Sequence, residues 1–242
     1  MPRSNTQRKS PPLIATTAKQ SDSGATLASA AYGRLRQDII NSVLPPGSKL
    51  RVQELCQNYG MGQSPLREAL NRLTRDGLVK LNDRRGFSVT PLSYQHLDAL
   101  TKTRCWINEI ALRESIVNGD RVWEEGVVLA YYRLSRIPRH DSGAPRKGAY
   151  NSEWEQAHRA FHTSLISACD SPWLITLCEQ LFDEADRYRH LARISEAPIP
   201  TRRDDHKLLV DAVTTRDADQ ATTIMKRHLS RTGQRARGQL LE

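Results

Sequence analysis

The sequence has no apolar run that approaches the roughly 20 residues of a membrane-spanning helix. Its first stretch, MPRSNTQRKSPPLIATTAKQ, also lacks the apolar core of a secretory signal peptide. We therefore expect a protein that works in the cytoplasm without contact to a membrane.

Cysteine is scarce as well, with 4 residues in a chain of 242, and none of them shows CxxC spacing. This pattern indicates neither a disulfide framework nor a zinc ribbon. All four fall in segments that we expect to be helical, where a thiol behaves as a small buried apolar group: Cys56, Cys105, Cys169 and Cys178. The chain also lacks HExxH, a nucleophile motif and a phosphate-binding loop, so we expect no enzymatic activity.

Acidic residues are too few to balance the basic ones, and the net charge is +9. The excess lies near the N-terminus, because residues 25–91 hold ten basic and five acidic side chains and residues 1–24 hold four and one. The remaining 151 residues carry 22 basic and 21 acidic groups. Positive charge alone would suit DNA, RNA or anionic lipid.

The stretch from Gly60 to Pro91 predicts one helix and a two-stranded wing. Ser64 can cap a helix that begins at Pro65. Apolar residues then recur at helical spacing and leave a basic face on the other side: Leu66, Ala69, Leu70 and Leu73. Gly77 ends this helix.

Two β-rich segments follow at residues 78–81 and 87–90, and the turn between them carries Arg84 and Arg85. Upstream, residues 52–59 predict a shorter helix, so a glycine-containing turn joins two helices. Together these elements predict a winged helix-turn-helix, in which the second helix enters a major groove and the wing lies along phosphates. A small helical domain with a solvated charged face is the alternative.

The strings LPPGSKL, SPLREALNRLTRDGLV and RRGFSV resemble the GntR family of bacterial transcription regulators over about residues 30–89. One winged helix reads only a few base pairs, so we expect a homodimer on a short inverted repeat of duplex DNA. The residues that we expect to contact DNA are Gln63, Ser64, Arg67, Arg72, Arg84 and Arg85. Gln63 stands where the family usually has Arg, which suits an adenine contact rather than a phosphate or guanine contact.

The whole chain predicts a mainly α fold in three parts: a disordered basic tail over residues 1–24, the winged helix-turn-helix over 25–91, and an all-helical effector-binding and dimerisation domain over 92–242. In the second part, residues 27–43 predict a further helix behind the DNA-reading unit. In the third part, helical periodicity without strand signals predicts a bundle of about six helices: 93–118, 121–136, 149–169, 172–195, 202–215 and 217–235.

Four of the seven histidines occupy matching places on three of these helices: His158, His162, His206 and His228. The first two are four residues apart and share a helix face. Neutral imidazoles from facing helices suit a divalent metal such as Zn²⁺ or Ni²⁺. Each histidine could also be a satisfied, partly buried side chain without a ligand role.

Residues 93–235 resemble the FCD domain, the helical effector domain of the FadR subfamily within GntR, through TRCWINEIAL, HRAFHTSLISACDSPWL, DDHKLLVDAV and MKRHL. Metal-binding members hold a divalent ion with one acidic residue and three histidines. The resemblance matches these histidines to His162, His206 and His228 and places His158 at the acidic position. The strings RCWINEIALRESI, WEEGVVLAYYRLSR and CEQLFDEADRYRHL look most like CsiR-type repressors, which control the catabolism of glutarate and related acids.

The same resemblance places a ligand-binding arginine at Arg104, and Tyr188 and Arg189 could add donors. An ion pair inside the bundle is the alternative role of Arg104. We therefore expect a repressor that a small dicarboxylate, bound at a metal-containing site, releases from its operator. Two alternatives are a constitutive DNA-binding protein whose helical domain only dimerises, and a metallohydrolase with Glu155 as base, which would leave the winged helix without a purpose.

Overall fold

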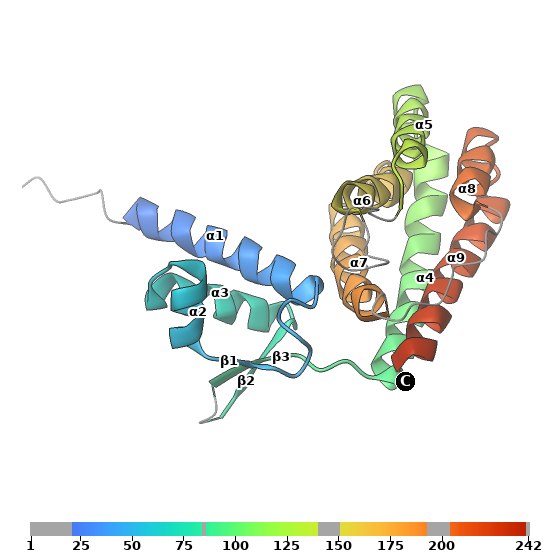
Figure 1. The fold of residues 1–242 in the computed structure, drawn as a ribbon. Helices are drawn as coiled ribbons and strands as arrows, with labels where there is room; N and C mark the ends of the chain where they lie inside the picture. Colours follow the sequence, from blue (N-terminus) through green and yellow to red (C-terminus); the bar gives the residue numbers. More distant parts are fainter. Residues whose placement is uncertain (1–20, 84–85, 140–150, 193–203, 241–242) are drawn as a thin grey trace, which may run out of the picture.

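The computed structural model describes residues 21–83, 86–139, 151–192 and 204–240. Over these ranges the protein is mainly helical and consists of an N-terminal unit with a small sheet and a C-terminal helical bundle (Figure 1). This confirms the predicted fold class. Among the described helices, none combines the length and apolar character of a membrane span.

The N-terminal unit is a winged helix-turn-helix. Its elements are α1 (Ser21–Ile40), β1 (Lys49–Leu50), α2 (Val52–Tyr59), α3 (Gln63–Arg75), β2 (Val79–Asn82) and β3 (Gly86–Val89). Gly60 turns the chain from α2 into α3 with a φ of 63°, a left-handed conformation that glycine adopts without strain. The apolar faces of α1, α3 and the sheet form one core: Ala31, Leu35, Ile39, Leu66, Leu70, Leu73, Val79 and Val89.

The start of α3 and the number of strands differ from the prediction. Helix α3 begins at Gln63 with Gly62 as its N-cap, so Ser64 lies inside the first turn and does not cap the helix. The wing strands β2 and β3 form as expected, but β3 also pairs with β1 in the order β1-β3-β2. Two residues are too short for a visible alternation of apolar and polar side chains, which is why the sequence pattern missed β1.

Helix α1 begins at Ser21, inside the tail that we predicted over residues 1–24. The segment that follows is rich in alanine, the best helix former, so helical propensity extends the helix beyond its buried stripe. The rest of the predicted tail, residues 1–20, lies outside the described residues.

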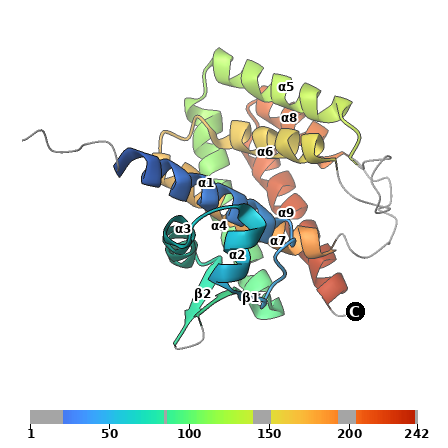
Figure 2. The ribbon, with the colours of Figure 1, turned by 60° about the vertical axis from the view of Figure 1, so that its left-hand side comes forward.

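The C-terminal bundle contains every helix that the periodicity predicted, with ends that shift by at most five residues: α4 (Tyr94–Asn118), α5 (Arg121–Arg136), α6 (Ser152–Ile166), α7 (Pro172–Ala192), α8 (Asp205–Thr214) and α9 (Ala218–Leu240). Helix α4 runs the length of the bundle beside α9 (Figures 1 and 2). The main core lies between the helices: Ala111, Leu112, Val127, Phe161, Leu165, Leu209, Val213, Met225 and Leu229.

All four cysteines are free thiols. Cys169 and Cys178 are buried, as expected, while Cys56 and Cys105 are partly buried. Cys169 lies just after the end of α6 rather than inside a helix.

Helix α7 holds the linker that leads from the wing into α4. Arg187, which is 1% exposed, donates a hydrogen bond to the carbonyl of Thr90. The hydroxyl of Tyr188 lies 3.2 Å from the carbonyl oxygen of Ser93 and 2.7 Å from Nδ1 of His96. Helix α1 also packs against α7 (Figure 2), so the two units meet at this helix.

Close packing of α4 on α9 generates a stability prediction. A Cβ atom at Gly233 of α9 would lie 2.5 Å from Oγ1 of Thr101 in α4. We expect Gly233→Ala to lower the free energy of unfolding by about 1 to 3 kcal/mol, because the added methyl forces the two helices apart. Urea denaturation of the purified protein measures this change.

Gly238→Ala is the matched control, since it lies on the same helix and its Cβ would meet no atom within 4 Å. This variant should be neutral or stabilised by up to about 1 kcal/mol through helix propensity. Combining Gly233→Ala with Thr101→Ala should recover most of the loss. Equal stability of the two glycine variants would contradict the close contact.

Candidate functional site

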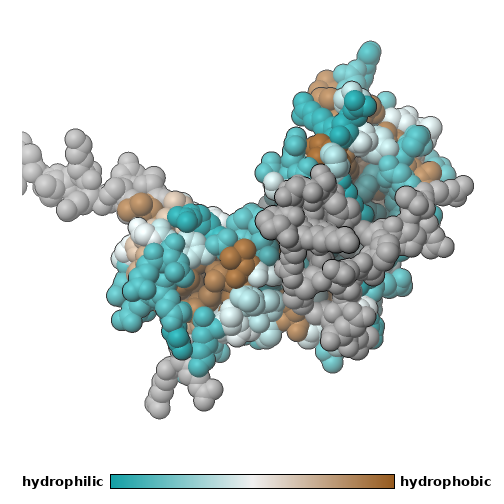
Figure 3. Space-filling model, viewed as in Figure 1, coloured by the Kyte–Doolittle hydropathy of each residue, from teal (hydrophilic) through white to brown (hydrophobic). Residues whose placement is uncertain are grey.

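The start of α3 forms an exposed polar face on the N-terminal unit. Gln63, Ser64 and Arg67 are all exposed, because the apolar stripe of α3 faces α1 and the sheet. Backbone N–H groups of a first helical turn attract phosphate, and side chains there reach base edges in helix-turn-helix proteins. In the view of Figure 3, hydrophilic side chains cover the outer end of this unit over α2.

Arg72 lies differently from the other predicted DNA contacts. Its guanidinium carbon is 4.5 Å from the centroid of the Tyr32 ring, and its Nη1 is 3.3 Å from Oγ of Ser29. Both partners belong to α1, so Arg72 braces α3 against α1, and this position does not favour a role in base reading. The wing residues Arg84 and Arg85 lie outside the described residues.

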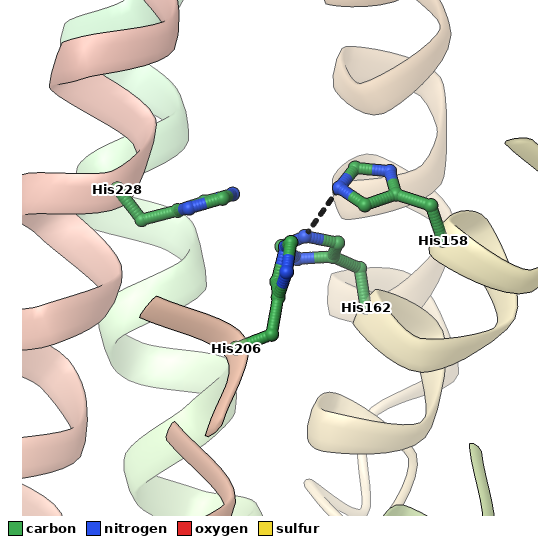
Figure 4. Close-up of side chains that lie close together, drawn as sticks. All are labelled: His158, His162, His206 and His228. Atoms are coloured by element: carbon green, nitrogen blue, oxygen red, sulfur yellow. Dashed lines mark hydrogen bonds between the residues drawn. The ribbon is translucent and has the colours of Figure 1, made fainter. Parts of the chain in front are cut away.

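Four histidines converge in the centre of the bundle (Figure 4). One ring nitrogen from each lies within 4.8 Å of the others: His158 and His162 from α6, His206 from α8 and His228 from α9. The Nε2 atoms of His158 and His162 are 3.1 Å apart. The structure therefore brings together all four histidines that the sequence selected.

Carboxylates at the start of α8 lie beside two of these rings. Asp204 caps α8, accepts the backbone N–H of His206 and lies 3.4 Å from Nδ1 of the same histidine. Asp205 lies 3.8 Å from Nδ1 of His228. Hydrogen bonds from these two imidazoles hold the pKa of Asp204 at about 2 and that of Asp205 well below its ordinary value. A carboxylate behind a histidine is the usual outer partner of a metal-binding imidazole.

Burial disfavours the charged form of three of the four histidines. Burial, followed by the nearby positive groups, lowers the pKa of His158 and His162 well below the ordinary value. Burial also lowers the pKa of His228 to about 4. Nε2 of His206 is buried without a hydrogen-bond partner. Neutral imidazoles donate lone pairs to a metal ion, and a buried ring nitrogen without a hydrogen-bond partner is free to do so. These residues therefore fit a divalent metal.

Two arginines lie beside the histidines. Arg104 of α4 is 7% exposed, forms no ion pair among the described residues, and has an Nε atom without a hydrogen-bond partner. Burial lowers its pKa to about 10, which leaves it protonated at neutral pH. Arg189 of α7 places Nη1 3.1 Å from Nδ1 of His158 and Nη2 2.5 Å from Oδ1 of Asp186. Because a guanidinium only donates, Nδ1 of His158 accepts and its Nε2–H points to His162.

Tyr188, which we expected to bind the effector, does not reach this cluster. Its hydroxyl lies at the start of α4 against Ser93 and His96. One step along a helix turns a side chain by about 100°, so Tyr188 faces the linker while Arg189 faces the histidines. Sequence reasoning named Arg189 beside Tyr188 as a possible donor, but it left out Asp204, which caps α8, and Asp205, although an acid directly before a candidate histidine is a visible signal.

Comparison with known proteins identifies both units. The model of the bacterial regulatory proteins of the GntR family matches residues 27–89, and the FCD domain model matches residues 100–231. The chain is 37% identical to the uncharacterized HTH-type transcriptional regulator BphR of Paraburkholderia xenovorans (strain LB400), over 84% of this chain and 82% of that protein. It is 32% identical to the HTH-type transcriptional repressor GlaR of Escherichia coli (strain K12), over 82% and 90%.

The fold also matches the solved structure of E. coli McbR/YncC, with a TM-score of 0.72 at 20% identity, over 88% of this chain and 98% of that chain. These findings confirm the resemblance to the GntR family and to the FCD domain. The narrower resemblance to CsiR-type repressors stays a prediction.

We expect the purified protein to bind one divalent ion per chain, and His206→Ala to lose most of it after dialysis, because the ring supplies one of the converging nitrogens. Elemental analysis measures the metal content. A free metal concentration of 100 times the dissociation constant should raise the free energy of unfolding by about 2.7 kcal/mol, and a chelator should remove this gain. His96→Ala, outside the cluster, is the control, and equal metal content in both variants would contradict the site.

Two of the arginines of α3, Arg67 and Arg72, should behave differently on DNA. We expect Arg67→Ala to weaken operator binding and to reduce the slope of log K against log salt by about one, because an exposed phosphate contact is lost. Arg72→Ala should instead lower the thermal stability of the N-terminal unit. Binding titrations at several salt concentrations and thermal melts separate the two, and a reversed pattern would show that Arg72 is the DNA contact.

Proposed function

Because this chain belongs to the GntR family of bacterial regulatory proteins and carries an FCD domain, we propose that it is a repressor that a small dicarboxylate releases from its operator. Like its relatives, the chain is a DNA-binding transcription regulator and not an enzyme. The observation that carries the finer proposal is the buried guanidinium of Arg104, which forms no ion pair among the described residues and lies beside four converging imidazoles.

A divalent ion, Zn²⁺ or Ni²⁺, would be held by His162, His206 and His228. When bound, it supplies positive charge and an open coordination position for a carboxylate oxygen. His158 keeps its proton on Nε2 while Arg189 occupies its Nδ1. It would therefore join the ligand set only when Arg189 moves away.

The charges around the histidines favour an anion. Three guanidinium carbons lie within 6 Å of the Phe182 ring centroid, at 5.7 Å for Arg104, 4.5 Å for Arg159 and 5.3 Å for Arg189. Two buried carboxylates, Asp183 and Asp186, face them. Both aspartates pair with other arginines, and Arg104 is left without an ion pair among the described residues. A buried charge of this kind is costly until an anion binds.

A dicarboxylate of four to six carbons satisfies both features. One carboxylate would meet the metal, and the second would reach Arg104, whose planar guanidinium can form a paired hydrogen bond with it. Glutarate is the first acid to try, because the sequence resembles regulators of glutarate catabolism. The acid needs to prefer the released form by about 1 to 3 kcal/mol, a typical coupling free energy.

Twofold DNA binding is part of the same proposal. A single winged helix reads only a few base pairs, so a homodimer on a short inverted repeat in the cytoplasm would give enough contacts. Helix α4 continues from β3 through residues 90–93. A shift of α4 on effector binding would change the spacing of the two reading helices.

The alternative is a constitutive DNA-binding protein whose bundle only dimerises. Buried Arg104 would then serve only the stability of the bundle, although no described carboxylate pairs with it. An operator gel shift with added glutarate, succinate and adipate separates the two functions, because only a ligand-responsive repressor is released.

We expect calorimetry of the metal-loaded protein to show binding of glutarate, with at least tenfold weaker binding in Arg104→Gln and in His206→Ala. Each variant removes the partner of one carboxylate, so butyrate, which has a single carboxylate, should also bind weakly. Arg113→Gln is the control on the same helix, because Arg113 pairs with Asp219 at the surface. Undiminished binding in both site variants would rule out this site.

A further inference from the structure

Alternating arginines and aspartates run from the histidine cluster to the DNA-binding unit. We call this set the ion-pair chain. Starting from the histidine His158, its members are Arg189, Asp186, Arg159, Asp183 and Arg36. Arg36 belongs to α1 of the N-terminal unit, Arg159 to α6, and the other three to α7. The chain thus connects the two units through side chains alone.

At the effector end, Arg189 serves two partners. It donates to Nδ1 of His158 at 3.1 Å and pairs with Asp186 at 2.5 Å. The other oxygen of Asp186 lies 3.4 Å from Nη2 of Arg159. That distance is long for a charge-assisted hydrogen bond, which is usually 2.7 to 2.9 Å, so Arg159 has room to approach Asp186.

At the DNA-binding end, Asp183 is shared in the same way. One of its oxygens accepts from Arg159 and the other pairs with Arg36. Asp183 and Asp186 are 8% and 7% exposed, so water screens these pairs only weakly. Each aspartate therefore divides its charge between two arginines, and a change at one end alters the competition at the next.

We propose that the ion-pair chain transmits occupancy of the effector site to the DNA-binding unit, such that an anion that binds Arg189 tightens the Arg36–Asp183 pair. This inference rests on the proposed function, because it takes the effector carboxylate that reaches Arg104 to draw Arg189 as well, since both guanidinium groups lie within 6 Å of the centre of the Phe182 ring. Once Arg189 turns to the effector, Asp186 loses the partner at 2.5 Å and keeps its ion pair with Arg159. Arg159 then leaves Asp183 for Asp186, and Asp183 pairs with Arg36 alone.

The consequence is a change in how firmly α1 is held. Without effector, Arg36 shares Asp183 with Arg159, and the N-terminal unit can adjust to the spacing of an operator. With effector, α1 is fixed against α7 in one orientation. Helix α7 also binds the linker, through hydrogen bonds from Arg187 to Thr90 and from Tyr188 to Ser93, so its position relative to the N-terminal unit is fixed at a second place.

Hydrogen exchange of the metal-loaded full chain tests the inference. We expect glutarate to slow the exchange of amides in residues 32–40 of α1 at least about fivefold, the lower end of usual coupling. Arg36→Gln should abolish this slowing and weaken glutarate binding by no more than the same factor, because coupling is reciprocal. Arg36→Gln changes a partly exposed side chain, so the fold should persist.

A second variant tests the ion-pair chain in the absence of any effector. Arg189→Gln removes the partner that an effector would withdraw, so it should slow α1 exchange by itself and make it insensitive to glutarate. Arg34→Gln is the matched control on α1, because Arg34 contacts Tyr59 within its own unit and should respond like the unmodified protein.

The outcomes separate the two proposals. If glutarate produces no heat with the unmodified protein, the proposed effector is wrong. The hydrogen exchange of Arg189→Gln still tests whether the ion-pair chain couples the two units. If hydrogen exchange of α1 in Arg189→Gln equals that of the unmodified protein, the ion-pair chain does not couple the effector site to the DNA-binding unit. The same conclusion follows if Arg36→Gln still responds to glutarate as Arg34→Gln does.

Discussion

The positive charge buried around Phe182 is the constraint on which the rest of the bundle depends. Three guanidinium groups lie within 6 Å of the centre of one phenyl ring, and two buried aspartates, Asp183 and Asp186, form the ion pairs with Arg159 and Arg189. Arg104 forms no ion pair among the described residues. Burying an uncompensated charge costs several kcal/mol, so the surrounding helices must hold these groups in place. Burial, together with these positive groups, also lowers the pKa of His158, His162 and His228 below the ordinary value.

Helix α7 joins features that belong to separate units. Between Phe182 and Arg189 its side chains contact the histidines, α1 and the linker into α4. A helix of 3.6 residues per turn presents successive side chains in different directions, so eight neighbouring residues can serve three surfaces. The bundle therefore needs no long-range deformation of its core for its centre to influence the winged helix.

Helical periodicity and histidine spacing were enough to predict most of this architecture. Residues at i and i+4, such as His158 and His162, share a face on any helix, and capped, amphipathic segments have well-marked ends. Side-chain partners across helices were not predictable. The sequence does not show that Arg72 stacks on Tyr32 of α1, and choosing Arg189 over Tyr188 requires the rotation of α7 in the bundle. The strand β1 depends on its partner β3, which lies far along the chain.

The attachment of α1 to α7 limits how freely the two units can be exchanged between proteins. Thr90 offers its backbone carbonyl to Arg187, a group that every residue has, so the linker would tolerate many sequences. Arg36 contributes a specific side chain to a buried aspartate. A sensor engineered by grafting another winged helix onto this bundle would thus need a long basic residue at the position of Arg36. Without it, the grafted unit would bind its own operator, but its binding would not respond to the effector.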